Sequence, residues 1–582
     1  MTRKTLHQLY AEHAGKVSDK WSLYLTEYDR LLDDYRESPI RLLEIGIQNG
    51  GSLEIWSKYF KQAAILIGCD INPACAGLRF DDPRIGVIVG DANGSDVREQ
   101  IVRRTPQVDI IIDDGSHQSS DMIKSFAMYF PMLADGGIYI LEDMHCSYWE
   151  SFGGGLFHPF SAVTFFKHLV DIIHYEHWGY PEVRAGIFQG FFTTCDCHID
   201  FDVLSQVKSV EFINSICVVR KAPAADDGSG RRLIVGAAEK AAPGMSATDE
   251  SKAHPLDEMG NGQARPKPTE ECLADTQYER LLRGYREKPV CLLKIGMQNG
   301  GSLDFWSEYF SQAAMVIGCD VDPACAGWHA DDPLISVIAG DAHCPDVRER
   351  IIRSTPQFDI IIDDGSHVSG DMIKTFVTYF PMLTEGGIFI VRNIDVSYRE
   401  KMNAGLFAGL VEPFSAMAFF KHFVDIINHE HWGFPRTRAD ILQSIFTKYK
   451  CHIGDEALSQ VHSVEFINSL CAVRKAADAD NGLGRRMIGG TVEIVTPEIL
   501  RTHGSESGLL DQIFNPWTRL GWAEEDLADA KWVLADTESA LADAERQIAQ
   551  MTSSRSWKMT RPLRKTARWM MKRMPLLSSK KM

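Results

Sequence analysis

The sequence predicts an α/β protein with two tandem Rossmann-like domains, each with a central, mostly parallel sheet, followed by a C-terminal coiled-coil helix and a basic tail. Three observations lead to this fold class. Residues 41–149 recur as residues 291–399, in a constant register of 250 positions. In each copy short apolar segments alternate with amphipathic ones, which is the pattern of a parallel sheet with helices on both faces. Apolar residues also recur every seven positions between 523 and 551.

The elements of the two copies are expected in the same order. Each copy begins with a helical segment that stops at a proline, YDRLLDDYRESP or YERLLRGYREKP. A short buried strand follows, RLLEIGI or CLLKIGM, and then a glycine-rich turn and the amphipathic helix SLEIWSKYF or SLDFWSEYF. Further strands are expected at AILIGCDI, IGVIVGD, VDIIIDDG and GGIYILED, with helices such as SSDMIKSFAMYFPML between them. SVEFINSICVVRKA and SVEFINSLCAVRKA read as late strands or a hairpin.

Changes in composition divide the chain. A stretch rich in Ala, Pro, Gly, Asp and Ser is typical of a flexible linker. The heptad segment carries Leu527, Leu534, Leu541 and Ile548 at one seam position. This repeat predicts a coiled coil through which the chain forms a homo-oligomer, the alternative being a lone solvated helix. The predicted segments are an active domain 1–221, a linker 222–268, a degenerate domain 269–500, a connector 501–522, a coiled coil 523–551 and a basic tail 552–582.

Composition limits the classes of function. Hydrophobic residues make up 45% and charged residues 24% of the chain, as in ordinary globular proteins. The N-terminus lacks the apolar run of a secretion signal, no segment approaches the roughly 18 apolar residues of a membrane span, and the thirteen cysteines read as reduced thiols. We therefore expect a cytoplasmic protein. The net charge is −18, and residues 551–582 carry ten Lys or Arg and no acid, so the remaining residues carry −28. This acidity argues against nucleic acid as a partner of the globular part.

The basic tail has a second feature. Trp557, Trp569 and Leu563 stand among its basic residues, so it could lie on the anionic inner face of the membrane. The alternative is a solvated, disordered tail. Its segment SRSWKMTRPLR is similar to a segment of bacterial glycosyltransferases and surface-polysaccharide enzymes. That similarity points to a glycan as the substrate.

The glycine-rich turn predicts a cofactor site. LEIGIQNGGS lies where a strand ends and a helix begins, the position at which α/β sheets bind ligands. Glu44 at the strand tip could hold a cationic group, while Gly46 and Gly50 let the backbone approach a ligand. Asp70 ends the second strand, where an acid can bind ribose hydroxyls, and Asp91 ends the third and can reach an adenine amino group. The turn is not GxGxxG, which disfavours a nicotinamide dinucleotide, and the acids on successive strand ends together favour S-adenosylmethionine.

Acids at later strand ends predict a metal site. Asp114 lies in IIIDDGSH, and Glu142 and Asp143 end a strand 28 residues further on. Three carboxylates at neighbouring strand ends suit a hard divalent cation, although acids that cap the following helices are the alternative. The second copy keeps the scaffold but changes three acids, Glu44 to Lys294, Glu142 to Arg392 and Asp143 to Asn393. We therefore predict one working site, in the first copy.

These motifs resemble a known family. SDKW (18–21), LEIGIQNGGSLEIW, GCDI, IDDGSH and EDMHCSYW make roughly residues 17–220 similar to the metal-dependent class I S-adenosylmethionine O-methyltransferases of the macrocin and mycinamicin type, which methylate sugar hydroxyls. The resemblance implies that Asp114, Glu142 and Asp143 bind Mg²⁺ and that His117 is the general base. A satisfied loop histidine is the alternative for His117, because the second copy retains His367. The predicted cofactor-binding residues are Glu44, Gly46, Asn49, Gly50, Ser52, Asp70, Asp91 and Asp113.

The function expected is therefore a magnesium- and S-adenosylmethionine-dependent O-methyltransferase that acts on a sugar hydroxyl of a glycan or glycosylated metabolite. The alternative is a non-catalytic scaffold or glycan-binding protein in a polysaccharide-assembly complex. A phenolic or other small-molecule hydroxyl as the acceptor would keep the same site. For the second copy two roles stay open, a built-in subunit that buries the dimer face of the first copy, or a glycan-binding module.

Overall fold

The computed structural model describes residues 3–178, 186–222, 277–297, 301–327, 332–399, 412–497, 499–500 and 513–553. Nearly all of the predicted linker and basic tail lies outside these ranges. Residues 1–521 form one compact unit that contains both copies, and residues 522–582 form a second. None of the described helices combines the length and the apolar character that crossing a membrane requires.

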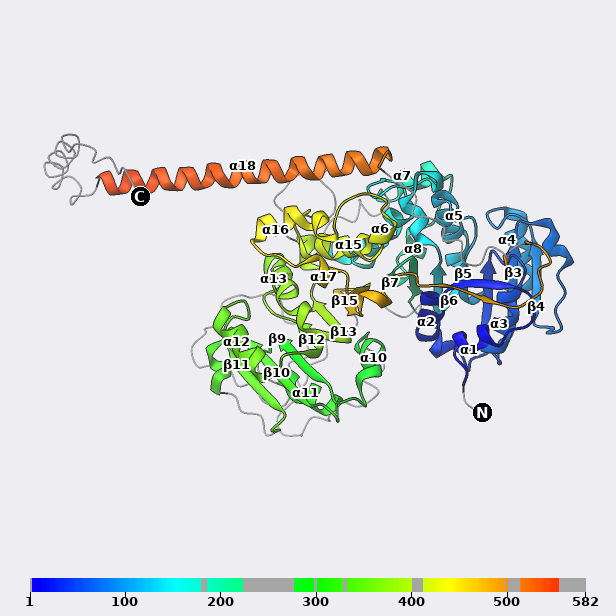
Figure 1. Cartoon of the computed structure of the whole chain (residues 1–582), viewed down its shortest axis with the longest axis horizontal. Helices are drawn as coiled ribbons and strands as arrows, with labels where there is room; N and C mark the ends of the chain where they lie inside the picture. Colours follow the sequence, from blue (N-terminus) through cyan, green and yellow to red (C-terminus); the bar gives the residue numbers. More distant parts are fainter. Residues whose placement is uncertain are drawn as a thin grey trace, which may run out of the picture. The chain divides into compact units, whose positions relative to one another are not determined.

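The strands of the first copy follow the predicted segments (Figure 1). They are β2 (Arg41–Ile45), β3 (Ile65–Asp70), β4 (Ile85–Val89), β5 (Val108–Asp113), β6 (Leu133–Leu141), β7 (Val207–Ile213) and β8 (Ile216–Lys221). Their order in the sheet is β4-β3-β2-β5-β6-β8-β7. The first five pair in parallel, in the order of a doubly wound sheet, and β8 runs antiparallel to both of its neighbours.

Helices cover both faces of this sheet. Adjacent residues of a strand point to opposite faces, so each strand contributes side chains to both helical layers. Ile138 and Ile140 of β6 pack in one core with Tyr28 and Trp56 from the helices near the N-terminus. Tyr139, between them, meets Phe126 on the other face. The helices are α1 (Leu6–Ala11), α2 (Ser22–Leu31), α3 (Gly51–Tyr59), α4 (Ser95–Arg104), α5 (Ser119–Tyr129), α6 (Ala162–Ile173), α7 (Gln189–Cys195) and α8 (Phe201–Leu204).

The second copy repeats this arrangement strand for strand. Its strands are β9 (Cys291–Ile295), β10 (Met315–Asp320), β11 (Ile335–Ala339), β12 (Phe358–Asp363), β13 (Leu383–Arg392), β14 (Val461–Ile467) and β15 (Leu470–Lys475). Its helices are α10 (Gln277–Leu282), α11 (Gly301–Tyr309), α12 (Pro345–Ser354), α13 (Ser369–Tyr379), α14 (Val396–Arg399), α15 (Ala416–Ile427), α16 (Gln443–Tyr449) and α17 (Asp455–Leu458). The sheet order is β11-β10-β9-β12-β13-β15-β14, which matches that of the first copy.

The two copies share one sheet. The sequence predicts a sheet in each domain, but β7 and β14 pair antiparallel and join them into a sheet of 14 strands. This pairing satisfies the backbone groups that each hairpin would otherwise leave open at its edge. Glu211 lies opposite Glu465 at the centre of the junction, and both side chains are buried. Arg220 contacts both carboxylates, at 3.3 and 3.1 Å, which offsets their repulsion.

Helices α6 and α15 cover the junction, since each contacts both β7 and β14. Reciprocal buried ion pairs join the two helices. Lys167 of α6 contacts Asp425 of α15, and Lys421 of α15 contacts Asp171 of α6. The two copies are therefore joined across the junction, while each also has a hydrophobic cluster of its own.

A segment after the second copy returns to the first. β16 (Arg486–Gly489) pairs antiparallel with β1 (Ser18–Trp21), and Lys20 lies opposite Met487. Further along, the side-chain oxygen of Asn49 accepts the backbone N–H groups of residues 494, 495 and 496. We call residues 483–497 the return segment. The domain prediction assigns them to 269–500, but they lie against the first copy.

The predicted coiled coil falls within one long helix, α18 (Pro516–Ser553), drawn in orange to red in Figure 1. Leu527, Leu534 and Leu541 are 53, 59 and 62% exposed. A row of exposed leucines at heptad spacing is what a coiled-coil seam needs before its partner binds.

A pH-sensitive ion pair crosses between the copies and supports a first prediction. His462 of β14 lies 2.9 Å from Glu27 of α2. Burial acts to lower the pKa of His462, but the hydrogen bond and charge of Glu27 raise it overall. Burial opposes ionisation of Glu27, yet Arg30 and His462 lower its pKa to about 2. A histidine with a raised folded pKa contributes stability that is present below its unfolded pKa of about 6.5 and is lost as the pH rises through the folded value.

We therefore expect His462→Gln to lower the free energy of unfolding by about 2 kcal/mol at pH 6 and by less at pH 9. Denaturant titration at both pH values measures the difference. His198→Gln is the control, because that side chain is 71% exposed and its pair with Asp200 contributes little. Equal losses at the two pH values for His462→Gln would contradict the prediction.

Candidate active site

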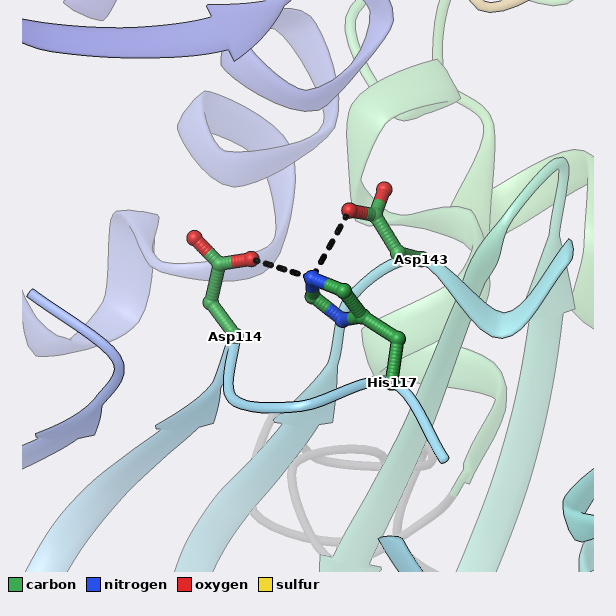
Figure 2. Close-up of side chains that lie close together, drawn as sticks. All are labelled: Asp114, His117 and Asp143. Carbon is green, nitrogen blue, oxygen red and sulfur yellow. Dashed lines mark ion pairs between the residues drawn. The ribbon is translucent and has the colours of Figure 1, made fainter. Parts of the chain in front are cut away.

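Three predicted side chains meet at the carboxyl edge of the first copy's parallel strands. Asp114 follows β5, Asp143 follows β6, and His117 lies in the loop after β5. One ligand atom from each lies within 4.8 Å of the others. His117 Nε2 is 3.4 Å from an oxygen of Asp143 and 3.9 Å from one of Asp114 (Figure 2). Two carboxylates at this spacing fit a divalent cation, and the imidazole between them is placed to act as a base beside it.

The backbone around these groups is unusual. His117 and Asp143 adopt left-handed conformations, with φ of 59° and 52°, which non-glycine residues take at a cost of about 1–3 kcal/mol. Gly46 has φ of 83°, and a Cβ added there would lie 2.0 Å from the carbonyl oxygen of Asp114. Glycine at this position therefore lets the turn after β2 pack directly against the loop that carries Asp114.

Glu142, the third predicted ligand, lies beside this cluster and not within it. Lys20 donates to both oxygens of Glu142 at 2.8 Å, and it also contacts Asp114. The hydroxyl of Tyr28 donates to Glu142 as well. The side chains of Lys20 and Glu142 are only 4% and 1% exposed. In this structure an ammonium group therefore holds the two carboxylates together, and the role of Glu142 as a metal ligand stays a prediction.

Burial makes these acids hard to ionise. It raises the pKa of Glu142 to about 8, with repulsion from Asp114 adding to the rise and Lys20 opposing it. Burial also raises the pKa of Asp114, and it raises that of Glu44 to about 7. For Lys20 burial acts to lower the pKa, but Asp114 and Glu142 hold it well above the usual value. More than one buried acid thus depends on a single ammonium, an arrangement in which an added cation is favoured.

Two of the predicted cofactor-binding residues accept hydrogen bonds from the backbone of nearby turns. An oxygen of Asp70 accepts the N–H groups of Ile47 and Gln48 at 3.0 and 2.8 Å, which ties the glycine turn to β3. Asp91 accepts the N–H of Asn93 at 2.9 Å. The second copy repeats the first contact through Asp320 and Met297 at 2.8 Å. These bonds therefore belong to the fold, and each carboxylate has lone pairs left for a ligand.

Three other predicted cofactor-binding residues make hydrogen bonds to neighbouring residues. Asn49 is buried against the return segment, and Ser52 donates to Glu44 at 2.8 Å. Asp113 accepts a hydrogen bond from Tyr139 at 2.8 Å, and burial raises its pKa to about 6. The other oxygen of Glu44 is buried and meets no hydrogen-bond criterion among the described residues, although the Trp56 indole N–H helps to lower the pKa of this carboxyl. Such an oxygen fits a ligand group that is cationic or donates a hydrogen bond, so the site remains compatible with the predicted cofactor.

In the second copy cations occupy the corresponding place. Lys294 lies 2.9 Å and Arg392 2.7 Å from the same oxygen of Asp364, the counterpart of Asp114. The Asn393 amide lies 3.2 Å from His367 Nε2. Two positive side chains around one carboxylate disfavour a metal ion. Lys294 thus makes the contact with Asp364 that Lys20 makes with Asp114.

Sequence reasoning missed the roles of Lys20, of Tyr28 and of Tyr24, whose hydroxyl donates to Asp143 at 2.6 Å. Lys20 lies 94 residues from Asp114 and 122 from Glu142 in the chain, so local pattern does not connect them. One signal was present. The stretch that contains SDKW is missing from the second copy, in which Glu44 has also become Lys294. The second copy has lost one lysine and gained another, which suggests that Lys20 and Lys294 neutralise equivalent carboxylates, Asp114 and Asp364.

The fold and site define the first copy as a Rossmann-like α/β domain with two acids and a histidine clustered at the carboxyl edge of its parallel strands. The chain is related to sugar O-methyltransferases of the mycinamicin, macrocin and tetracenomycin type, which confirms the resemblance inferred from the motifs. No family model matches it. Mycinamicin VI 2''-O-methyltransferase of Micromonospora griseorubida is 40% identical over 138 residues, which cover 22% of this chain and 34% of that protein. Demethylmacrocin O-methyltransferase of Streptomyces fradiae is 34% identical over 179 residues, 28% of this chain and 44% of that one.

A third relative is 8-demethyl-8-alpha-L-rhamnosyl tetracenomycin-C 2'-O-methyltransferase of Streptomyces olivaceus, 34% identical over 179 residues, 29% of this chain and 46% of that one. The chain thus spans less than half the length of these relatives. Among solved structures, the MycE methyltransferase of the mycinamycin pathway in complex with Mg, SAH and mycinamycin VI is 28% identical with a TM-score of 0.29, covering 36% of this chain and 51% of that one.

Proposed function

We propose that the first copy is an O-methyltransferase that uses S-adenosylmethionine and Mg²⁺ to methylate a sugar hydroxyl of a glycan or glycosylated metabolite. The observation that carries this proposal is the cluster of Asp114, His117 and Asp143 at the carboxyl edge of the sheet. The relatives support it, since their names describe O-methyltransferases of glycosylated antibiotics. Asp114 and Asp143 would hold the metal, and Glu142 would join them.

The residues of this site have the chemical groups that methyl transfer to a sugar hydroxyl requires. A sugar hydroxyl is a weak nucleophile near neutral pH, and Mg²⁺ held by Asp114 and Asp143 would stabilise the alkoxide. His117 lies between the two acids, where its Nε2 can take the hydroxyl proton, a role worth roughly 10²–10⁴ in rate. Glu44, at the tip of β2, offers a buried oxygen to the cationic part of the cofactor.

The other predictions extend this proposal. The chain would be a tandem of an active domain within 1–221 and a degenerate one within 269–500. The exposed leucines of α18 would form a coiled coil between copies, and the basic tail would contact the membrane from the cytoplasm. The similarity of the tail to surface-polysaccharide enzymes favours a role in polysaccharide biosynthesis. None of the contacts described above favours the scaffold alternative.

Calorimetry with S-adenosylhomocysteine tests the proposal. We expect the chain to bind this product. We also expect the product to bind when Mg²⁺ is present, because the metal occupies a separate site. Asp70→Ala should weaken binding by at least about tenfold, the loss of one hydrogen bond to a charged group. Asp320→Ala is the matched control, because it releases the equivalent turn in the degenerate copy. It should leave binding unchanged.

The outcomes separate the two functions. Binding that only Asp70→Ala weakens supports one cofactor site, in the first copy. Absence of any binding by the wild-type chain would favour the scaffold. Mass spectrometry of glycans from cells that express the wild-type chain or the Asp114→Ala variant would then identify the methylated sugar.

A further inference from the structure

The loop that follows Asp143 is held by the second copy. His145 lies in this loop, in the short helix Met144–Tyr148, and His431 lies in the second copy's helix His429–His431. Their rings stack with centroids 4.5 Å apart and planes at 29°. The indole N–H of Trp149 donates to the backbone oxygen of His431 at 3.0 Å. Both histidines are buried, with exposures of 7 and 6%.

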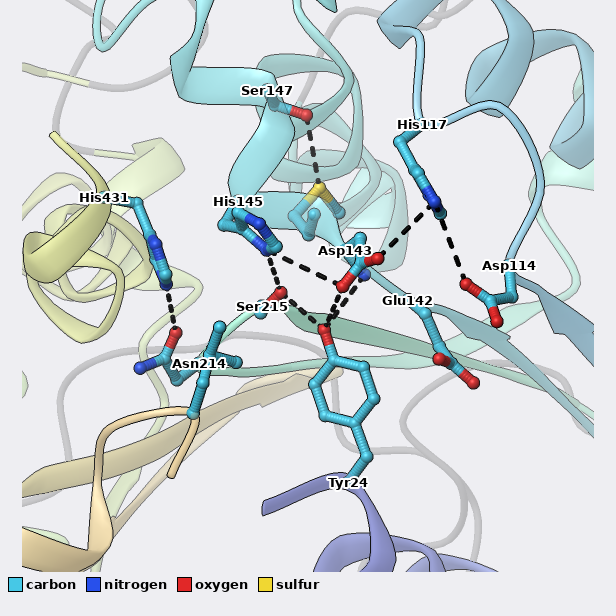
Figure 3. Close-up of polar contacts among 12 residues, drawn as sticks. Tyr24, Asp114, His117, Glu142, Asp143, His145, Ser147, Asn214, Ser215 and His431 are labelled. Atoms are coloured by element: carbon cyan, nitrogen blue, oxygen red, sulfur yellow. Dashed lines mark hydrogen bonds and ion pairs between the residues drawn. The ribbon is translucent and has the colours of Figure 1, made fainter. Parts of the chain in front are cut away.

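Hydrogen bonds continue from this stack to the active site (Figure 3). His145 Nδ1 contacts the hydroxyl of Ser215. That hydroxyl lies 2.6 Å from the hydroxyl of Tyr24, which donates to one oxygen of Asp143 at 2.6 Å. The other oxygen of Asp143 faces His117 at 3.4 Å. The orientation of the Asp143 carboxylate therefore depends on where Ser215 and His145 lie.

The second copy also fixes the turn that carries Ser215. The side-chain oxygen of Asn428 accepts the N–H of Ser215 at 2.8 Å. His431 Nε2 lies 2.9 Å from the side-chain oxygen of Asn214. Asn214, Ser215 and Asn428 are at most 2% exposed. Ser215 has φ of 66°, so its left-handed conformation needs such support. Two adjacent residues of the first copy are thus anchored by two residues of the second.

We propose that Asn428 and His431 of the second copy are positioning residues for Asp143, so that the degenerate copy completes the metal site of the first. This inference rests on the proposed function, in which Asp143 is a metal ligand. Partners that orient metal-binding side chains usually contribute 10–100-fold to metal affinity or activity. The second copy is then retained because it orders the first copy's site through this contact, without chemistry of its own.

The internal symmetry of the chain supplies a matched control. His177 of the first copy is the counterpart of His431, and its Nε2 lies 3.1 Å from Asn468 and 3.3 Å from Ser469, the counterparts of Asn214 and Ser215. This contact points toward the degenerate site, where Asn393 replaces Asp143. Both histidines contact counterpart residues across the junction, although His177 lies 3.4 Å from Asp395 where His431 stacks on His145. Only His431 leads to a carboxylate of the active site.

The test is calorimetric titration of Mg²⁺ into the full-length chain saturated with S-adenosylhomocysteine. We expect His431→Ala to weaken Mg²⁺ binding by about tenfold or more, while His177→Ala changes it by less than about twofold. Thermal unfolding should show similar losses of Tm for both variants. Asn428→Ala keeps both stacked histidines in the chain and releases the N–H of Ser215 together with the carbonyl of Val424, so it tests the same support if His431→Ala fails to fold. It should also weaken Mg²⁺ binding.

Three results would overturn the inference. Equal effects of His431→Ala and His177→Ala on Mg²⁺ affinity would show a merely structural role. Wild-type affinity in both His431→Ala and Asn428→Ala would show that Asp143 needs no support from the second copy. If the wild-type chain itself takes up no Mg²⁺, the metal part of the proposed function fails and the inference falls with it. The wild-type titration therefore distinguishes the two failures.

Discussion

Replacing Asp114 by Asn should lower the kcat/KM of Mg²⁺-dependent methyl transfer by roughly 10²–10³, while the same change at Asp364 should leave it intact. Asp114 is close to both His117 and Asp143, so its charge is needed to hold the metal and to place the acceptor oxygen. Stabilisation of the alkoxide by a metal is worth several kcal/mol, which corresponds to a loss of roughly 10²–10³ in kcat/KM. The measurement is transfer of labelled methyl groups to a glycosylated acceptor over a range of Mg²⁺ concentrations.

Asp364→Asn is the matched control because it makes the identical change at the counterpart position. There Lys294 and Arg392 already neutralise the carboxylate, so no metal is lost. If high Mg²⁺ raises the remaining activity of the Asp114→Asn variant, the substitution has weakened metal binding. Full activity in the Asp114→Asn variant, or loss of activity only in Asp364→Asn, would show that the working site was assigned to the wrong copy.

Replacing Lys20 by Met should give the largest loss of stability, and Mg²⁺ should restore much of it. The change leaves Asp114 and Glu142 buried without their shared cation, and removing one partner of a buried ion pair costs about 3–5 kcal/mol. Burial already raises the pKa of Glu142 to about 8, and loss of Lys20 raises it further. A carboxyl with a raised folded pKa loses its stabilising contribution as the pH rises through that value, so the defect should be greater at pH 9 than at pH 6.

Denaturant titration in EDTA and in excess Mg²⁺ measures this effect. A ligand that binds the folded state alone stabilises it, and the gain should be larger for Lys20→Met than for the wild type because no ammonium competes with the metal. Lys294→Met is the control. Arg392 still contacts Asp364 in that variant, so we expect a smaller loss and no recovery with Mg²⁺. If Mg²⁺ stabilises Lys20→Met no more than it stabilises the wild type, the ammonium and the metal do not share these carboxylates.

Local sequence determined the elements and the contrast between the two copies. Apolar runs such as VDIIID are strands because both faces of a parallel sheet are buried, and β5 and β12 form at these segments. The loop IDDGSH brings Asp114 and His117 together because they are three residues apart after a strand. The change of Glu142 and Asp143 to Arg392 and Asn393 marked the degenerate site, and the structure shows Arg392 on Asp364. Such features depend on neighbours in the chain, which a sequence displays directly.

Only the tertiary structure decided how the copies combine. The pairing of β7 with β14 depends on which sheet edges remain free after each copy has folded, and no local pattern records that. The same holds for Lys20, whose place between Asp114 and Glu142 depends on β1 pairing with β16 from beyond the second copy. The hydrogen bonds from the return segment to Asn49 likewise depend on the folded arrangement of both copies. These contacts join residues that are more than 90 positions apart, and their energies come from burial and charge that exist only once both copies are folded.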